Sequence, residues 1–214
     1  MCIRDSYSTL YVGPDVTINT SYYYAAFITA STDNFSYGAS IDFNGKTNGG
    51  LYLNGNSKAT SGNIPSITIG STAEIKATAD GYLGLYAAGY GNYIVEDGAY
   101  IKGNGSGIAI KSGNLTINGG TVAAVGNNST PTPGFNNGVN SSGAAIQIES
   151  NPGYAGRINI DILGGDISSA NCFSIYEYYG GKDQTEATTA VEKIAVTNGT
   201  FAGPISVSEV LRCV

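Results

Sequence analysis

The segment from residue 107 to residue 125, GIAIKSGNLTINGGTVAAV, holds three short alternating runs of apolar residues. The first two runs are Ile108–Ile110 and Leu115–Ile117, and the third begins at Val122, directly after the pair Gly119–Gly120. Alternation with period 2 indicates β-strands, and paired glycines indicate turns. No stretch between the runs is long enough for a helix, so the segment predicts one coil made of short strands and turns.

Variants of this unit recur along the chain. We take the second apolar residue of each pair that resembles Leu115-x-Ile117 as a marker, and successive markers are 25, 26, 26, 22, 45 and 34 residues apart. Periods of this size are typical of stacked repeat units. We expect the two long intervals to contain surface loops at residues 126–143 and 177–190, the first being the least ordered internal segment. The markers are Ile18, Phe43, Ile69, Val95, Ile117, Ile162 and Val196.

Two residue types keep a fixed distance from the markers. Glycine stands three residues after each of the last four, which predicts a corner with positive φ, the backbone region that glycine enters freely. Asparagine stands three residues before three of the markers, which predicts a ladder of side-chain amides bonded along the stack. The glycines are Gly98, Gly120, Gly165 and Gly199, and the asparagines are Asn92, Asn114 and Asn159.

A second column of apolar pairs precedes the markers. All of these strands are short and linked by turns, which excludes βαβ units and leaves parallel stacking of coils. The sequence therefore predicts an all-β fold, a single-stranded right-handed parallel β-helix of about seven coils and ~30 to 35 Å length. The side chains of Ile69, Val95, Ile117, Ile162 and Val196 should stack inside it. The second column consists of Leu51/Leu53, Leu83/Leu85, Ile108/Ile110, Ile146/Ile148 and Phe173/Ile175.

We expect four regions along the chain. Residues 1–6 resemble the translation of a sequencing adapter and are excluded from fold reasoning. Residues 7–48 lack the glycine column and are either degenerate first coils or a cap. Residues 49–208 form the β-helix, and residues 209–214 are a truncated tail. We therefore interpret the chain as an interior fragment of a longer protein with further domains.

The composition excludes several function classes. The chain has 10 Lys and Arg against 16 Asp and Glu, a net charge of −6, and no basic stripe that could neutralise phosphates. We therefore expect no nucleic-acid partner. No run approaches the ~20 apolar residues of a membrane span. The chain has no histidine and no EF-hand spacing, so we expect no metal and no cofactor. Cys172 is expected to fill apolar space.

The repeated copies LTINGGTV (Leu115–Val122), IDILGGDI (Ile160–Ile167) and IAVTNGTF (Ile194–Phe201) resemble the right-handed parallel β-helix repeats of bacterial surface and adhesin-like proteins. At the level of architecture they are also similar to the pectate-lyase-like superfamily. The resemblance implies this fold and an extracellular or cell-surface location. Enzymes of that superfamily use aspartates with a Gly-His-Gly segment, or an arginine beside a calcium cluster. Those motifs do not carry over, because the chain has no histidine and, beyond residue 6, only Arg157 and Arg212.

The second column also predicts an outward row of side chains. We expect Lys111 and Glu149 to form an exposed pair in this row, contributing at most ~1 kcal/mol. Glycoside hydrolysis needs two carboxyl groups about 5 to 10 Å apart, and the row has one carboxylate, so no residue is assigned a catalytic role. Tyr86, Lys111, Glu149 and Tyr176 are the candidates for carbohydrate binding, although tyrosine also simply suits strand surfaces. The row reads Asn54, Tyr86, Lys111, Glu149 and Tyr176.

Two functions from different classes remain open. The first is a non-catalytic structural or adhesive segment of a secreted bacterial cell-surface protein, which presents loops and contacts glycans. The alternative is a carbohydrate-active β-helix, either a polysaccharide lyase or glycoside hydrolase, or a carbohydrate-binding module. The expected partner in both is a polysaccharide or cell-surface glycan, and the fold alone does not choose between them.

Overall fold

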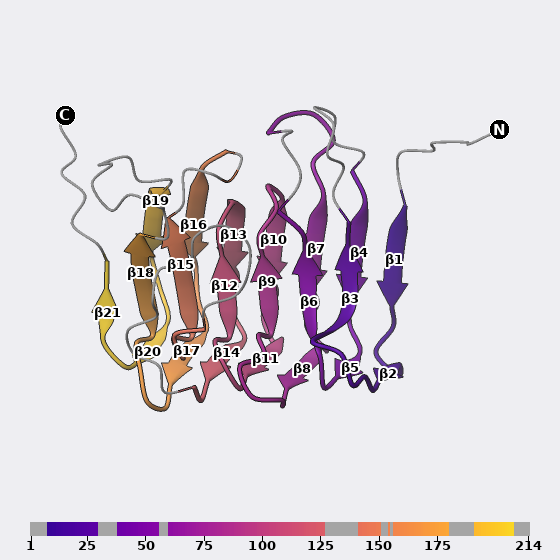
Figure 1. The fold of residues 1–214 in the computed structure, drawn as a ribbon, viewed down its shortest axis with the longest axis horizontal. Coiled ribbons are helices and arrows are strands. Elements are labelled where there is room, and N and C mark those ends of the chain that lie inside the picture. The colour runs from indigo at the N-terminus through magenta and orange to yellow at the C-terminus, as the bar shows by residue number, and fades with distance from the viewer. Residues whose placement is uncertain are drawn as a thin grey trace.

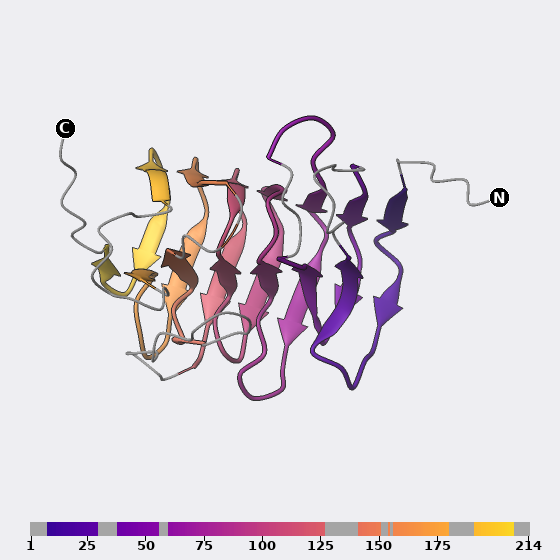
Figure 2. The ribbon, with the colours of Figure 1, turned by 45° about the horizontal axis from the view of Figure 1, so that its top comes forward.

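The computed structural model describes residues 8–29, 38–55, 60–126, 141–150, 154, 156–179 and 191–207. These ranges contain strands and turns and no helix, and every strand belongs to one of three parallel sheets of seven strands. The sheets form the three faces of a right-handed parallel β-helix of about seven coils, with β1 and β21 at opposite ends (Figures 1 and 2). The predicted fold class is confirmed.

Each coil contributes one strand to each sheet, always in the same order. Sheet A contains β1 (Thr9–Val12), β4 (Ser40–Phe43), β7 (Ser66–Ile69), β10 (Asn92–Val95), β13 (Gly113–Ile117), β16 (Ile158–Ile162) and β19 (Val191–Val196). Sheet B contains β2 (Thr17–Ile18), β5 (Lys46–Thr47), β8 (Glu74–Ala77), β11 (Tyr100–Gly103), β14 (Thr121–Ala124), β17 (Asp166–Ser169) and β20 (Thr200–Ala202). Sheet C contains β3 (Tyr24–Ile28), β6 (Gly50–Leu53), β9 (Leu85–Ala87), β12 (Ile108–Ile110), β15 (Ile146–Ser150), β18 (Ile175–Tyr179) and β21 (Ile205–Ser206).

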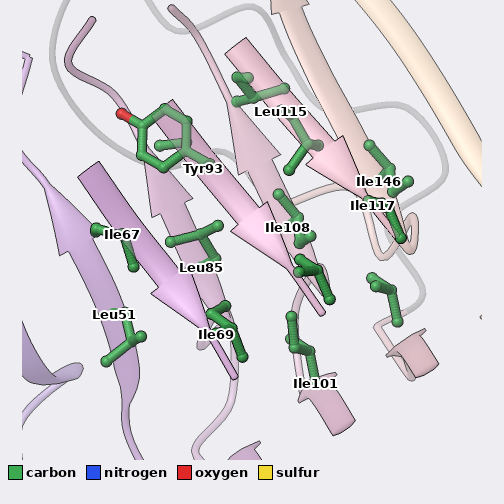
Figure 3. Close-up of a cluster of buried hydrophobic side chains, with 14 of the residues drawn as sticks. Leu51, Ile67, Ile69, Leu85, Tyr93, Ile101, Ile108, Leu115, Ile117 and Ile146 are labelled. Atoms are coloured by element: carbon green, nitrogen blue, oxygen red, sulfur yellow. The ribbon is translucent and has the colours of Figure 1, made fainter. Parts of the chain in front are cut away.

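The core is the interior of the stack, where alternate side chains of all three sheets meet. Figure 3 shows Ile69 and Ile117 from sheet A, Ile101 from sheet B and Leu85 from sheet C converging. All four are fully buried. Burying each such side chain stabilises the fold by about 1.5 to 3 kcal/mol. The alternating pattern read from the sequence is therefore the pattern that fills this core.

The marker column is correct at its centre and wrong at both ends. Phe43, Ile69, Val95, Ile117 and Ile162 follow one another in register along sheet A, fully buried. Ile18 lies in sheet B instead, and Val12 takes its place by pairing with Phe43. Val196 pairs with Ile162 but is 46% exposed. It is exposed because β19 is the last described strand of sheet A, so no further described coil covers it.

The glycine column forms the predicted corner. Gly98, Gly120, Gly165 and Gly199 have φ of 89°, 77°, 102° and 125°. Each also lies against the backbone of the coil before it, so that a Cβ at Gly98 would stand 2.7 Å from Ser71 O. A residue with a side chain would therefore suffer both backbone strain and a collision at this corner.

The asparagine ladder is confirmed as well. Asn114 Nδ2 donates to Asn92 Oδ1 at 3.0 Å, and Asn159 Nδ2 donates to Asn114 Oδ1 at 3.3 Å. The three residues pair in register on β10, β13 and β16. The amides thus bond successive coils along the outer side of sheet A.

The second apolar column needs a correction of two residues in two coils. Leu51 pairs with Leu85 and not with Leu83, and Ile146 pairs with Ile175 and not with Phe173. A shift of two keeps every side chain on the same face, so alternation alone could not exclude it. Glu177 consequently occupies the inward position beside Ile148.

The regions expected outside the regular coils fall partly in the described ranges. Residues 8–47 contribute β1 to β5 to the same three sheets as the rest of the chain. The second expected loop begins later than residue 177, because β18 continues to Tyr179. Residues 127–140 and 180–190, which make up most of the two expected loops, lie outside the described residues, as do residues 1–7 and 208–214.

Candidate functional site

Lys111 and Glu149 meet on the outer side of sheet C. Their Nζ and Oε2 atoms are 2.9 Å apart, and each side chain is only 2% exposed. The predicted pair is therefore confirmed, but its predicted exposure is wrong. A buried ion pair loses the hydration of both charges, so its energetics differ from those of a surface pair.

Aromatic side chains surround the lysine of this pair. Tyr154, in the connection between β15 and β16, accepts a hydrogen bond from Lys111 Nζ at 3.4 Å. The same ammonium lies 5.1 Å from the centre of the Tyr154 ring and 5.7 Å from that of the Tyr86 ring. Ring faces attract cations and compensate part of the lost hydration. The contact with Tyr154 could not be found from strand periodicity, because this residue belongs to no strand.

A chain of hydrogen bonds continues from Glu149 across neighbouring coils. Tyr178 Oη donates to Glu149 Oε2 at 3.0 Å, and Gln147 Nε2 donates to Tyr178 Oη at 3.1 Å. Ser106 Oγ donates to Gln147 Oε1 at 2.9 Å. Burial, followed by the neighbouring Glu149 charge, raises the pKa of Tyr178 well above its ordinary value. The phenol therefore remains a hydrogen-bond donor to the carboxylate at neutral pH.

Glu149 has one carboxylate oxygen that this chain of hydrogen bonds does not use. Its Oε1 atom is buried and has no hydrogen-bond partner among the described residues. A buried, unpaired acceptor costs about 1 to 3 kcal/mol, and such groups in native structures require an explanation. Chemically, this oxygen can accept one more hydrogen bond from a water molecule or another donor.

The predicted outward row mixes two adjacent rows. Tyr86 pairs with Ala109 and Tyr176 with Gln147, so both tyrosines lie two residues before the row that holds Lys111 and Glu149. The cause is the two-residue shift of the second column described above. Asn54, directly after β6, keeps its place near the Lys111 row.

Only one of the four predicted carbohydrate-binding residues offers part of its surface to solvent. Tyr86, Lys111 and Glu149 are buried, and the Tyr86 ring stacks on that of Tyr52 at 5.0 Å. Tyr176 is half-buried and stacks on Phe173 at 4.8 Å. The structure thus brings two of the four into direct contact and places the two tyrosines beside them.

Exposed aromatic rings gather at the other end of sheet C. Tyr23 and Phe27 are 61% and 63% exposed, and Tyr22 is also exposed. The Tyr23 ring lies 4.4 Å from that of Tyr82. Phe27 continues the row of Tyr52 and Tyr86 in register. These rings form an aromatic surface at the β3 end of sheet C, within the region that the sequence analysis described only as degenerate coils or a cap.

The outer face of sheet B carries a charged groove that sequence reasoning missed. Lys46, Glu74 and Tyr100 are in register on β5, β8 and β11, and Lys76 pairs in register with Lys102. Glu74 forms ion pairs with Lys46 at 3.5 Å and with Lys76. The hydrogen bond from Lys76 lowers the pKa of Glu74, so the carboxylate stays ionised. The signal was present as Glu74-x-Lys76 followed one coil later by Tyr100-x-Lys102.

Within the described ranges, no three His, Cys, Asp or Glu side chains gather as metal ligands, and no helix could cross a membrane. Cys172 is buried, and its thiol donates to Ser142 O at 3.0 Å. Burial raises the pKa of this thiol.

Comparison with known proteins finds no match for this chain. No protein-family model, no curated protein sequence and no solved structure matches the chain.

Proposed function

We propose that the chain is a non-catalytic structural and adhesive β-helix segment of a secreted bacterial cell-surface protein. The observation that carries this proposal is the register of the three sheets, which continues from β1 to β21 through every described coil. Such a stack is suited to hold surface side chains at fixed positions along a stiff support. An extracellular location and the adhesin-like class remain parts of the proposal, carried by the resemblance of the repeats.

Stiffness follows from how the coils are connected. Each inner coil is hydrogen-bonded to both neighbours on three sides, and the asparagine ladder adds side-chain bonds along sheet A. Six spacings of about 4.8 Å separate seven strands, which gives a support roughly 29 Å long. Stacked-repeat proteins of this kind present extended surfaces to their partners.

The proposed contacts with glycans use aromatic rings that solvent can reach. Exposed aromatic rings can stack on the apolar faces of sugars. Tyr23 and Phe27 provide such exposed rings on sheet C. Tyr176, one of the predicted residues, adds a half-buried ring nearer the other end of the sheet. Lys111 and Glu149 lie buried on the same outer side of sheet C and do not reach the solvent.

Glycan-array binding with matched tyrosine variants tests the adhesive part. A double variant, Tyr23→Ser with Phe27→Ser, should lose binding to the glycans that the unchanged segment retains. Tyr11→Ser is the control, because Tyr11 is 62% exposed but lies on sheet A. If no glycan is retained, or if both variants lose binding equally, the aromatic surface is not an adhesive site.

One observation favours the second candidate, a carbohydrate-active enzyme. Glu149 has an unpaired oxygen, Oε1, while its other oxygen, Oε2, contacts Lys111 and Tyr178, and all three side chains are of types that general acid and base chemistry uses. A screen of the purified segment on neutral and acidic polysaccharides tests it. Turnover that Glu149→Gln abolishes, with the fold retained by circular dichroism, would establish this candidate in place of the first.

A further inference from the structure

Two lysines face the same side of sheet B at directly neighbouring positions. Lys76 on β8 and Lys102 on β11 are partners in register, on strands that lie about 4.8 Å apart. Like charges placed directly opposite each other destabilise a sheet. The charge of Lys76 is compensated by Glu74, which also forms an ion pair with Lys46. Within the described ranges Lys102 has no ion-pair partner, and the part of this face formed by β5, β8 and β11 carries three lysines against one glutamate in a chain of net charge −6.

The same residues line a hollow. A cavity of about 220 Å³ is lined by the two lysines and by Ala77, Thr78, Tyr100, Asn104 and Val125. A second hollow of about 500 Å³ adjoins it, shares Lys76 and Tyr100 with it, and is lined by Glu74 as well. Together they form a groove that crosses the outer face of sheet B from the Gly98 corner toward Asn104.

The lining defines what the groove can hold. The unpaired ammonium of Lys102 attracts an anion, and Lys76, whose charge Glu74 partly neutralises, adds a second ammonium beside it. The Asn104 amide donates and accepts hydrogen bonds, and Tyr100 with Val125 supplies an apolar wall. A lone inorganic anion would use the charges but not the wall. Nucleic acid needs many cations along its backbone, and two lysines on an acidic protein cannot supply them.

We propose that this groove binds an acidic glycan, with a sugar carboxylate or sulfate placed between Lys76 and Lys102 and the sugar ring against Tyr100 and Val125. Lysine is a point charge without the fixed fork of arginine, so it accepts either anion. The inference rests on the proposed function, because only a chain at the cell surface would meet extracellular glycans. It concerns a different face of the molecule from the aromatic surface of sheet C.

Binding measurements on the folded chain at 50 mM NaCl test the proposal. Dextran sulfate against unmodified dextran isolates the sulfate, and hyaluronan fragments probe the carboxylate. We expect binding to at least one of the anionic polymers and none to dextran. Because charge-assisted contacts are strong, Lys102→Met should weaken binding at least about tenfold. Tyr100→Ala should weaken it as well, and 500 mM NaCl should reduce it further.

Lys193→Met is the matched control. It removes the same charge from sheet A, at a distance from the groove, and should leave binding unchanged. Equal loss in this variant and in Lys102→Met would overturn the proposal by reducing it to net charge. Equal binding of duplex DNA, or no binding of either anionic polymer, would also overturn it. None of these results would change the outcome for Tyr23 and Phe27, so failure here is distinguishable from failure of the proposed function.

Discussion

At the scale of single residues, the buried pair of Lys111 and Glu149 makes the first prediction. Removing one partner leaves the other charge buried, so Lys111→Met should lower the free energy of unfolding by about 3 to 5 kcal/mol. Combining it with Glu149→Gln should cost less than the sum of the two single changes. Urea denaturation of the four proteins in this cycle measures the coupling, and strictly additive losses would contradict a direct interaction.

The buried tyrosines predict how stability depends on pH. Burial raises the pKa of Tyr86, Tyr93 and Tyr178 far above the ordinary value of about 10. Above pH 10 the unfolded chain releases these protons and the folded chain retains them, so alkali favours unfolding. Above pH 10, the free energy of unfolding should therefore fall by about 1.4 kcal/mol per pH unit for each of these tyrosines.

Urea titrations between pH 9 and pH 11 check this dependence. Tyr86→Phe should make the decline of stability less steep, because one proton fewer is released on unfolding. Tyr11→Phe, on the solvent side of sheet A, serves as the control variant. An identical slope for Tyr86→Phe and the unchanged chain would mean that Tyr86 ionises equally in both states.

At the scale of elements, the corner after each sheet A strand is the sensitive position. Gly98→Ala places a side chain at φ 89° and 2.7 Å from Ser71 O, so it should destabilise the fold by about 1 to 3 kcal/mol. Gly62→Ala shares a positive φ of 82° but has open space around its Cβ, so it reports the backbone strain alone. Thermal denaturation should show the larger loss at Gly98. Equal losses would mean that contact between coils is unimportant there.

The elements also show what sequence reasoning could and could not predict. The columns of Ile117, Gly120 and Asn114 were found because each of these positions admits few residue types. The position of Ile18 and the pairing of Leu85 were predicted wrongly, because the alternation of apolar residues stays the same after a shift of two residues or a change of sheet. The contact of Lys111 with Tyr154 could not be predicted either, because Tyr154 lies outside every periodic pattern. The groove at Lys102 was visible as a motif but needed the register to bring its parts together.

At the scale of the whole molecule, the stack should open from its ends. Strands in the middle coils are hydrogen-bonded on both sides, whereas β1 and β19 have one described neighbour each. Amide hydrogen exchange should therefore be slowest in β10, β12 and β13 and fastest in β1 to β3 and β19 to β21. Mass spectrometry of proteolytic fragments would measure this, and uniform protection from end to end would show a single cooperative unit instead.

The register of sheet A also bears on how such a chain can change over generations. Asn92 to Val95 occupy the positions that Asn114 to Ile117 occupy one coil later. An in-frame exchange of DNA that deletes or duplicates residues 92–113 therefore leaves every remaining side chain on its original face. The length of the support can thus be inherited as a whole number of coils, each adding or removing about 4.8 Å of reach without a new fold having to arise.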